Sequence, residues 1–437
     1  MMSILQYINL HKSNDARRDM AIRALDQGAG ELEKSVTGAP VSIVLKFFFM
    51  PVVWIAYICS LAPLMSYLFF CRVMGRQSPK VEWLPLEVLE RLLAFWGRFP
   101  MVAALKIREA EFFVTERIVH PSLEIGVHTG DHSFALHRNR HITYGLEYLP
   151  DLALQLPKGD KEKVFDFFVS ADASNQPFRD SSLATVLSVH SVDDMQRPAS
   201  DIVKEVARTL CPGGRFCFSL FSEGWRRANG ILEAVCRFLP DSWGKKLRDL
   251  WSFGFYNLMS EREWRELAAQ HHLLAESITP FVCGWTFWLF ALPFRFEGVL
   301  WNLCDLRKIW LLPAWLRRRL AIGVAQAMRN EDTRQSPVNK AKRAMNYYIV
   351  LSKPGECSVL RQEADPVPAE ARYVILRCVQ CGCTPLVPLP GAGAGYRCPG
   401  CEAMFTLHNG VMLAHARAGT GSVARPLAGP ILEEVKI

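Results

Sequence analysis

Residues 123–130 read Leu-Glu-Ile-Gly-Val-His-Thr-Gly, a short apolar run that ends in a glycine-rich turn. We expect a strand that leads into this turn and a helix that begins near Asp131. Glycine suits Gly126 and Gly130 because the backbone there must bend sharply and approach a ligand closely. The N-terminus of the following helix offers free N–H groups to such a ligand. Glycine turns of this kind are common, so the interpretation depends on the flanking sequence.

Short apolar runs alternate with helical patterns after this turn, which indicates βαβ units and a parallel sheet. Helices are expected at Ser200–Leu210 and Ser260–Leu273. The seven predicted strands are Leu123–Gly126, Ile142–Glu147, Phe165–Ser170, Ala184–Val189, Arg215–Phe221, Ala275–Thr279 and Tyr347–Ser352. The sequence therefore predicts an α/β fold with a Rossmann-like sheet whose last two strands form a hairpin-like pair.

Acidic side chains follow the second and third of these strands. Glu147 ends the second strand about twenty residues after the glycine turn, where a carboxylate can accept both hydroxyls of a ribose. Asp172 follows the third strand, and a carboxylate there can accept a hydrogen bond from an adenine amino group. A turn at Leu210–Gly214 precedes the fifth strand. These features together indicate a nucleoside-containing ligand at the carboxyl edge of the sheet.

Four segments in this order resemble the motifs of class I S-adenosylmethionine-dependent methyltransferases of the type 11 kind, over Pro121 to Lys353. The segments are LEIGVHTG, YGLEYLP, SADASNQPF and LCPGGRF. The resemblance implies a seven-stranded methyltransferase sheet and S-adenosylmethionine as cofactor. The implied cofactor-binding residues are Glu124, Gly126, His128, Gly130, Glu147, Asp172 and Ala173. A dinucleotide-binding dehydrogenase is the competing Rossmann interpretation, and the segment around Asp172 and the final strand pair favour the methyltransferase.

The predicted catalytic residues follow the fourth strand. Methyl transfer needs a positioned acceptor and, where the acceptor is a hydroxyl, a base. His190 is the candidate base because a neutral imidazole titrates near working pH, and Asp193 or Asp194 would orient it. The alternative is that His190 only shapes the pocket.

The stretch Phe47–Cys71 runs for 25 residues without a charge. A helix of that length would span the ~30 Å hydrocarbon core of a bilayer. Pro51 and Pro63 interrupt the run and basic residues flank both of its ends, so we expect a re-entrant hairpin or an in-plane helix as readily as a single span. A buried core helix is the alternative.

A long insertion, Pro280–Met345, separates the last two strands and opens after a parallel strand. It should therefore roof the acceptor pocket. Its aromatic opening and the LRRRL segment Leu316–Leu320 suit a membrane interface, whereas a buried helical cap is the alternative. Between Trp301 and Lys353 there are eleven Lys and Arg against three Asp and Glu, an excess that equals the net charge of the whole chain, +8.

Four cysteines near the C-terminus form two CxxC pairs, Cys378 with Cys381 and Cys398 with Cys401. Two such knuckles place four thiolates around one zinc ion, and the type I′ turn signal Asn409-Gly410 predicts a hairpin beside them. Four thiolates leave no open coordination position, so the metal should be structural. The unit is similar to zinc ribbons.

These predictions divide the chain into five parts. They are a helical N-terminal region with the membrane-associated segment (1–118), the methyltransferase domain with its insertion (119–353), a linker (354–371), a zinc ribbon (372–416) and a disordered tail (417–437). We expect a methyltransferase at the cytoplasmic face of a membrane that acts on a lipid-associated or small amphipathic acceptor. The alternative is an RNA or tRNA methyltransferase that holds nucleic acid with the ribbon and the basic insertion. The sequence does not indicate an oligomeric state.

Overall fold

The structure is a computed structural model. It describes residues 43–74, 82–137, 140–227, 237–240, 255–283, 289–297, 312–336, 344–356, 375–389 and 395–414. The predicted N-terminal helical segment before residue 43, most of the linker and the tail lie outside these residues, as do Trp285 and Phe287 of the insertion.

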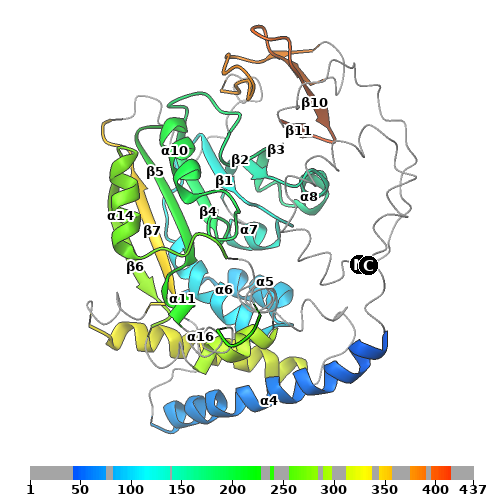
Figure 1. Ribbon diagram of the computed structural model, residues 1–437, viewed down its shortest axis with the longest axis vertical. Coiled ribbons are helices and arrows are strands. Elements are labelled where there is room, and N and C mark those ends of the chain that lie inside the picture. Colours follow the sequence, from blue (N-terminus) through cyan, green and yellow to red (C-terminus); the bar gives the residue numbers. More distant parts are fainter. Residues whose placement is uncertain are drawn as a thin grey trace.

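A large, mostly parallel sheet forms the centre of the molecule (Figure 1). Its methyltransferase part has the order β6-β7-β5-β4-β1-β2-β3, in which β7 alone runs antiparallel to its neighbours. The strands are β1 (Ser122–Ile125), β2 (Ile142–Glu147), β3 (Phe165–Ser170), β4 (Leu183–Val189), β5 (Leu210–Phe221), β6 (Leu274–Phe281) and β7 (Asn346–Ser352). The predicted fold class and all seven predicted strands are confirmed, because the buried parallel strands are near-continuous apolar runs.

Helices pack on both faces of this sheet and across the carboxyl ends of its strands. Near the sheet faces lie α7 (Asp131–Leu136), α8 (Pro150–Ala153), α9 (Leu156–Gly159), α10 (Ala199–Thr209), α11 (Gly224–Arg227) and α14 (Glu261–Gln270). The helices α4 (Ile43–Val73), α5 (Leu86–Trp96), α6 (Pro100–Phe113) and α16 (Ala314–Arg334) lie at the end toward which β5 and β6 point (Figure 1). The N-terminal region and the insertion therefore meet at the edge where an open α/β sheet binds its ligands.

The apolar segment near the N-terminus forms one continuous helix, α4, with Pro51 and Pro63 inside it. The expected re-entrant hairpin is therefore wrong. Trp54, Tyr57 and Leu61 recur at helical spacing and are buried against the domain, so packing holds the helix straight despite the two missing backbone N–H groups. The helix lies beside α16 along the base of the molecule (Figure 1).

Buried ion pairs join α6 to α16. Arg108 of α6 lies 2.9 Å from Asp332 of α16, and both side chains are almost fully buried. The Asp332 carboxylate also accepts hydrogen bonds from the backbone N–H groups of Val282 (3.1 Å) and Cys283 (2.8 Å), just after β6. One carboxylate thus joins the beginning of the insertion, its last helix and the N-terminal region.

A second carboxylate joins α4 to α6. Glu297 lies in a helix over residues 289–297 and accepts a hydrogen bond from the Tyr57 hydroxyl of α4 (2.7 Å). It also accepts from the N–H groups of Met101 and Val102 (2.9 and 3.0 Å), so it caps the N-terminus of α6. Burial raises the pKa of Glu297 to about 8.

The C-terminal unit is built from β8 (Val387–Pro388), β9 (Tyr396–Arg397), β10 (Met404–His408) and β11 (Val411–Leu413). The expected hairpin turn is confirmed: Asn409 and Gly410 have φ of 49° and 79° between antiparallel β10 and β11. This unit contacts the methyltransferase domain directly, because β11 pairs in parallel with β3 and continues the sheet to eleven strands. An unpaired edge strand exposes backbone N–H and C=O groups, and β11 covers that edge of β3.

We expect the stability conferred by Glu297 to depend on pH. Because the folded-state pKa of about 8 exceeds the ordinary 4.5, unfolding between these pH values releases a proton. The stabilisation is therefore present below about pH 4.5 and is lost as the pH rises toward 8. Denaturant unfolding of wild type and Glu297→Gln, which does not titrate, should show the stability of wild type falling relative to the variant from pH 5 to pH 8. Parallel profiles would contradict this assignment.

Candidate cofactor and acceptor site

The turn after β1 lies against the loop after β4. Gly126 and Gly130 have φ of +75° and +81°, a region that favours glycine. A Cβ atom at Gly126 would lie 2.2 Å from the Ser191 hydroxyl oxygen, so a larger residue would push the two segments apart. The turn therefore depends on glycine both for its backbone conformation and for its close contact with the segment that holds His190.

Glu147 joins this turn to the end of β2. Its buried carboxylate accepts hydrogen bonds from the backbone N–H of His128 (2.8 Å) and of Leu149 (3.0 Å). The first of these bonds holds His128 in the left-handed region, with φ 54°. His128 thus contributes its backbone to the turn, whereas its side chain is exposed.

Glu124, the acidic residue within β1, is already bonded within the domain. Its carboxylate accepts a hydrogen bond from the hydroxyl of Ser133 in α7 (2.6 Å) and lies 3.2 Å from Nε2 of His137, the C-cap of that helix. All three side chains are buried. Glu124 therefore fixes α7 behind the glycine turn, and its part in cofactor binding would be indirect.

The loop after β3 places Asp172 at the strand end, as the sequence predicts. One carboxylate oxygen accepts hydrogen bonds from the Ser174 N–H (2.9 Å) and hydroxyl (2.7 Å), and the other lies 3.2 Å from the Arg197 guanidinium. Ala173 beside it is buried. The loop is thereby held in one turn at the adenine side of the predicted site.

Asp194 makes the site suitable for a cation or a hydrogen-bond donor. Burial, followed by the negative charges of Asp193 and Glu147, raises the pKa of Asp194 to about 7. Its Oδ1 atom is buried and has no hydrogen-bond partner in the part of the chain that the structure describes. S-adenosylmethionine carries a sulfonium, an ammonium and hydroxyl groups, so the residues present fit this cofactor.

His190 stands at the centre of a buried polar cluster directly after β4. Its Nδ1 lies 3.1 Å from Asp193 Oδ2, which also accepts the Phe221 backbone N–H (2.8 Å). Its Nε2 lies 3.0 Å from the Asn346 amide nitrogen. Burial lowers the pKa of His190, which favours the neutral imidazole that a base requires.

Two residues of α6, Lys106 and Glu109, complete this cluster. The fully buried Glu109 carboxylate contacts Nε2 of His190 and lies 2.9 Å from Lys106 Nζ. Burial lowers the pKa of Lys106 to about 8. Neither residue was predicted from the sequence, because the amphipathic pattern of this segment is typical of a helix that only packs against a sheet. The available signal was the run of charges in VAALKIREAEFF, which lies in an otherwise apolar helix.

Aromatic rings surround the other side of His190. Its ring lies 4.5 Å from that of Phe221 at the end of β5, which in turn contacts Trp225 at 4.7 Å. Phe294, from the insertion, packs on both of these rings at 6.0 and 5.6 Å. The insertion therefore does cover the segment after β5, and the environment beside His190 is apolar.

The four cysteines of the CxxC pairs converge on one point. Their sulfur atoms all lie within 4.8 Å of one another, with 3.6 Å between Cys378 and Cys401 and 3.4 Å between Cys381 and Cys398. Tetrahedral Zn–S bonds of about 2.3 Å require sulfur separations close to these values. Backbone N–H groups of Gln380 and Gly400 point at the sulfurs of Cys378 and Cys398. The four residues thus fit a zinc ion, whereas Cys383 lies outside the cluster.

Replacing Glu109 should change the titration of His190. In Glu109→Gln the negative charge beside Nε2 is lost, so the imidazolium is less stabilised and the pKa of His190 should fall by about one unit. Histidine NMR titration measures this shift. Glu111→Gln, on the same helix but paired with Arg329, is the control and should leave His190 unchanged. Equal His190 pKa values in wild type and Glu109→Gln would remove Glu109 from the cluster.

Comparison with known proteins identifies one matching family model and several similar solved structures. Residues 123–218 match the family model of a methyltransferase domain. Among solved structures, the chain is similar to the complex of the Haloferax volcanii Trm112 methyltransferase activator and a putative methyltransferase (16% identity, 61% of this chain and 97% of that chain, TM-score 0.35). It is also similar to geranyl diphosphate C-methyltransferase from Streptomyces coelicolor A3(2) (15% identity, 56% and 76%, TM-score 0.32). No curated protein matches significantly. The matched segment covers most of β1 to β5 and the cofactor-side motifs, so this part of the chain is a methyltransferase domain.

Proposed function

We propose that this methyltransferase acts at the cytoplasmic face of a membrane, on a lipid-associated or small amphipathic acceptor. The observation that carries the proposal is the outward face of α4. This helix is long and apolar enough to cross a bilayer, which by itself is weak support. The way in which it packs on the domain is more informative.

One face of α4 packs on the domain along most of the described helix. The buried side chains are Trp54, Tyr57, Ser60, Leu61, Leu64 and Cys71. The outward face is also apolar, with Val52, Ile55, Ile58, Met65, Phe69, Phe70 and Val73 at 40–70% exposure. A helix held along its length by its own domain, with an apolar face left outside, favours insertion in the plane of the membrane rather than across it.

Cations and an exposed tryptophan lie near this face, at the start of α16. Trp315 is 58% exposed, and the Arg319 guanidinium stacks over its ring at 5.4 Å. Arg318 is half exposed and bonds to Glu90 of α5 (2.6 Å). Tryptophan and arginine together suit the headgroup region of a bilayer with anionic lipids.

The same end of the molecule leads to the predicted acceptor site. The helix over residues 289–297 joins α4 through the Tyr57–Glu297 bond and places Phe294 on the rings beside His190. An acceptor that leaves the membrane under α4 and α16 would therefore meet the carboxyl edge of the sheet. An apolar body with one polar group fits the aromatic surroundings of His190.

The roles of the residues follow from their positions. S-adenosylmethionine, when bound, supplies a methyl group that is already activated on sulfur. The glycine turn and Glu147 would hold its amino-acid and ribose parts, Asp172 its adenine, and Asp194 would face a positively charged group. His190 would take the proton of an acceptor hydroxyl at Nε2 once that hydroxyl replaces the Asn346 amide there, while Asp193 holds Nδ1 and the Glu109 charge stabilises the imidazolium. The aromatic rings exclude water from this transfer.

Zinc is the second cofactor that we propose, bound by Cys378, Cys381, Cys398 and Cys401. The chemistry of four clustered thiolates supports it, and four protein ligands favour a structural role. We expect about one zinc ion per chain by metal analysis. The double variant Cys378→Ser/Cys401→Ser should lose it, whereas Cys383→Ser should retain it. Zinc retained in the double variant would disprove this ligand set.

The proposed acceptor class is tested with methyl-labelled S-adenosylmethionine. The purified enzyme is incubated separately with a total lipid extract and with total RNA, and incorporation of label is measured in each. We expect label in the lipid fraction. Label in the RNA fraction alone would overturn the proposal in favour of the nucleic-acid alternative.

The membrane surface is tested by cosedimentation with vesicles of phosphatidylcholine and phosphatidylglycerol. Ile55→Glu/Phe69→Glu places two charges on the outward face of α4 and should reduce vesicle binding at least tenfold, because each buried charge opposes insertion. Leu274→Glu, at an equally exposed position on β6, is the matched control and should bind as wild type does. Unchanged binding by the α4 variant would show that this helix does not meet lipid.

A further inference from the structure

The C-terminal ribbon contacts the loop that follows β3, which is the predicted adenine side of the cofactor site. Strand β11 pairs with β3 from Val411 opposite Phe168 to Leu413 opposite Ser170. The N–H of Ala414 then donates to the Ser170 carbonyl (2.8 Å). Asp172 lies two residues beyond this last bond, so the ribbon reaches the end of the strand from which Asp172 projects.

The first cysteine knuckle holds the same loop from its other end. The N–H of Arg179 donates to the Ile375 carbonyl (2.7 Å), and the N–H of Arg377 donates to the Pro177 carbonyl (3.0 Å). The Asn175 side-chain amide donates to the Val379 carbonyl (3.2 Å), and Val379 lies between Cys378 and Cys381. A carbonyl of the metal-binding turn thus bonds directly to the loop over residues 171–179.

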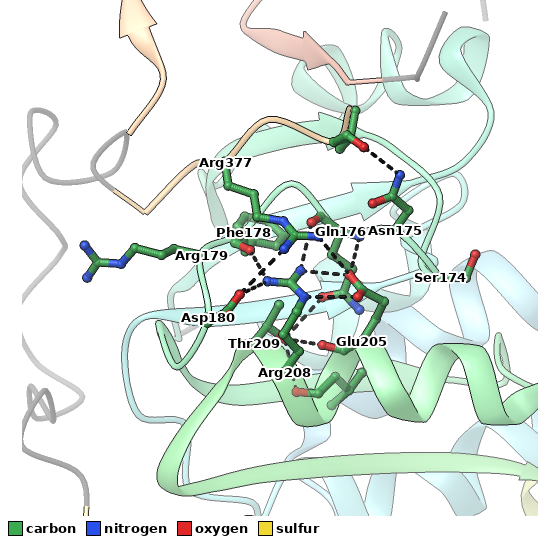
Figure 2. Close-up of polar contacts among 12 residues, drawn as sticks. Ser174, Asn175, Gln176, Phe178, Arg179, Asp180, Glu205, Arg208, Thr209 and Arg377 are labelled. Carbon is green, nitrogen blue, oxygen red and sulfur yellow. Dashed lines mark hydrogen bonds and ion pairs between the residues drawn. The ribbon is translucent and has the colours of Figure 1, made fainter. Parts of the chain in front are cut away.

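An ion-pair network adds to these backbone bonds. Arg208 of α10 lies 2.6 Å from Asp180 and 2.8 Å from Glu205, and Arg377 of the ribbon approaches the same two carboxylates at 3.6 and 3.9 Å. Glu205 also accepts the N–H of Gln176 within the loop (2.9 Å). Figure 2 shows Arg377 and Arg208 side by side, with Asp180 and Glu205 flanking them.

The strands of the ribbon are short, and its buried apolar side chains pack against the domain. Strands β8 and β9 contain two residues each, and β11 contains three. A unit of this size rarely buries enough apolar surface to fold without a metal or a disulfide. The backbone positions of Val379, Ile375 and Arg377 therefore depend on the four thiolates being held together as well as on the contacts with the domain.

We propose that the ribbon is part of the cofactor site: by holding residues 171–179 it positions Asp172, so zinc binding and S-adenosylmethionine binding strengthen each other. This inference rests on the cofactor and zinc sites of the proposed function. Because a coupling free energy is reciprocal, each ligand should raise the affinity for the other by the same factor. The Asn175–Val379 bond is the most direct link between the two sites.

The test is calorimetric titration of the full-length, zinc-loaded protein with S-adenosylmethionine. Asn175→Ala removes one hydrogen bond and should weaken binding about two- to tenfold, because such a bond is worth ~0.5–1.5 kcal/mol. Zinc content should stay unchanged, since no thiolate is altered. Met404→Ser, at a 61% exposed position of β10, is the matched control and should bind as wild type does.

The reciprocal measurement is zinc affinity by competition with a chromogenic chelator. Saturating S-adenosylmethionine should tighten zinc binding in wild type, and this gain should shrink in Asn175→Ala by the same factor that the calorimetry gives. Unchanged cofactor affinity in Asn175→Ala, together with zinc affinity that ignores the cofactor, would overturn the inference.

A third variant separates this failure from failure of the cofactor site itself. Glu147→Ala removes a buried charged partner and should weaken S-adenosylmethionine binding about tenfold or more. If Glu147→Ala weakens binding and Asn175→Ala does not, the cofactor site stands and the ribbon is independent of it. If neither variant has an effect, the assignment of the cofactor site is wrong.

Discussion

The arrangement of this protein depends on the pairing of charges that α6 buries beneath the sheet. A buried charge without a partner costs several kcal/mol, so each of these side chains must meet a group of opposite sign. Arg108 meets Asp332 of α16, and Glu109 meets Lys106 and His190. These pairs fix the insertion and the segment after β4 relative to the N-terminal region. Helix α6, which packs on α16, therefore also contributes to the predicted catalytic cluster.

Negative charge is concentrated at the carboxyl edge of the sheet. Glu147 is held by the backbone of the glycine turn and Asp193 by the backbone of β5, and the nearby Oδ1 of Asp194 has no hydrogen-bond partner among the described residues. Burial, followed by the charges of Asp193 and Glu147, raises the pKa of Asp194, and a cationic cofactor would favour its charged form. The negative charges of the site therefore favour a positively charged ligand.

The ribbon covers the edge of β3, which would otherwise be exposed. Its hairpin adds strands to that edge and protects the backbone groups there. The same contacts bring the metal-binding turn to the adenine-side loop. The ribbon therefore both protects the edge of β3 and supports the loop over residues 171–179.

The sequence by itself determined the elements whose signals are local. The strands were predicted to within a few residues because buried parallel strands are short apolar runs, and Asn409-Gly410 predicted its turn because both positions need positive φ. Local signals also predicted the glycine turn, the acidic strand ends and the paired cysteines.

Only the tertiary structure decided which distant segments meet. Glu109 contacts His190, which lies 81 residues later in the sequence, and β11 pairs with β3. α4 stays one helix through two prolines because its inner face packs on the domain. Each of these outcomes depends on a partner far along the chain, and no local pattern encodes the identity of that partner.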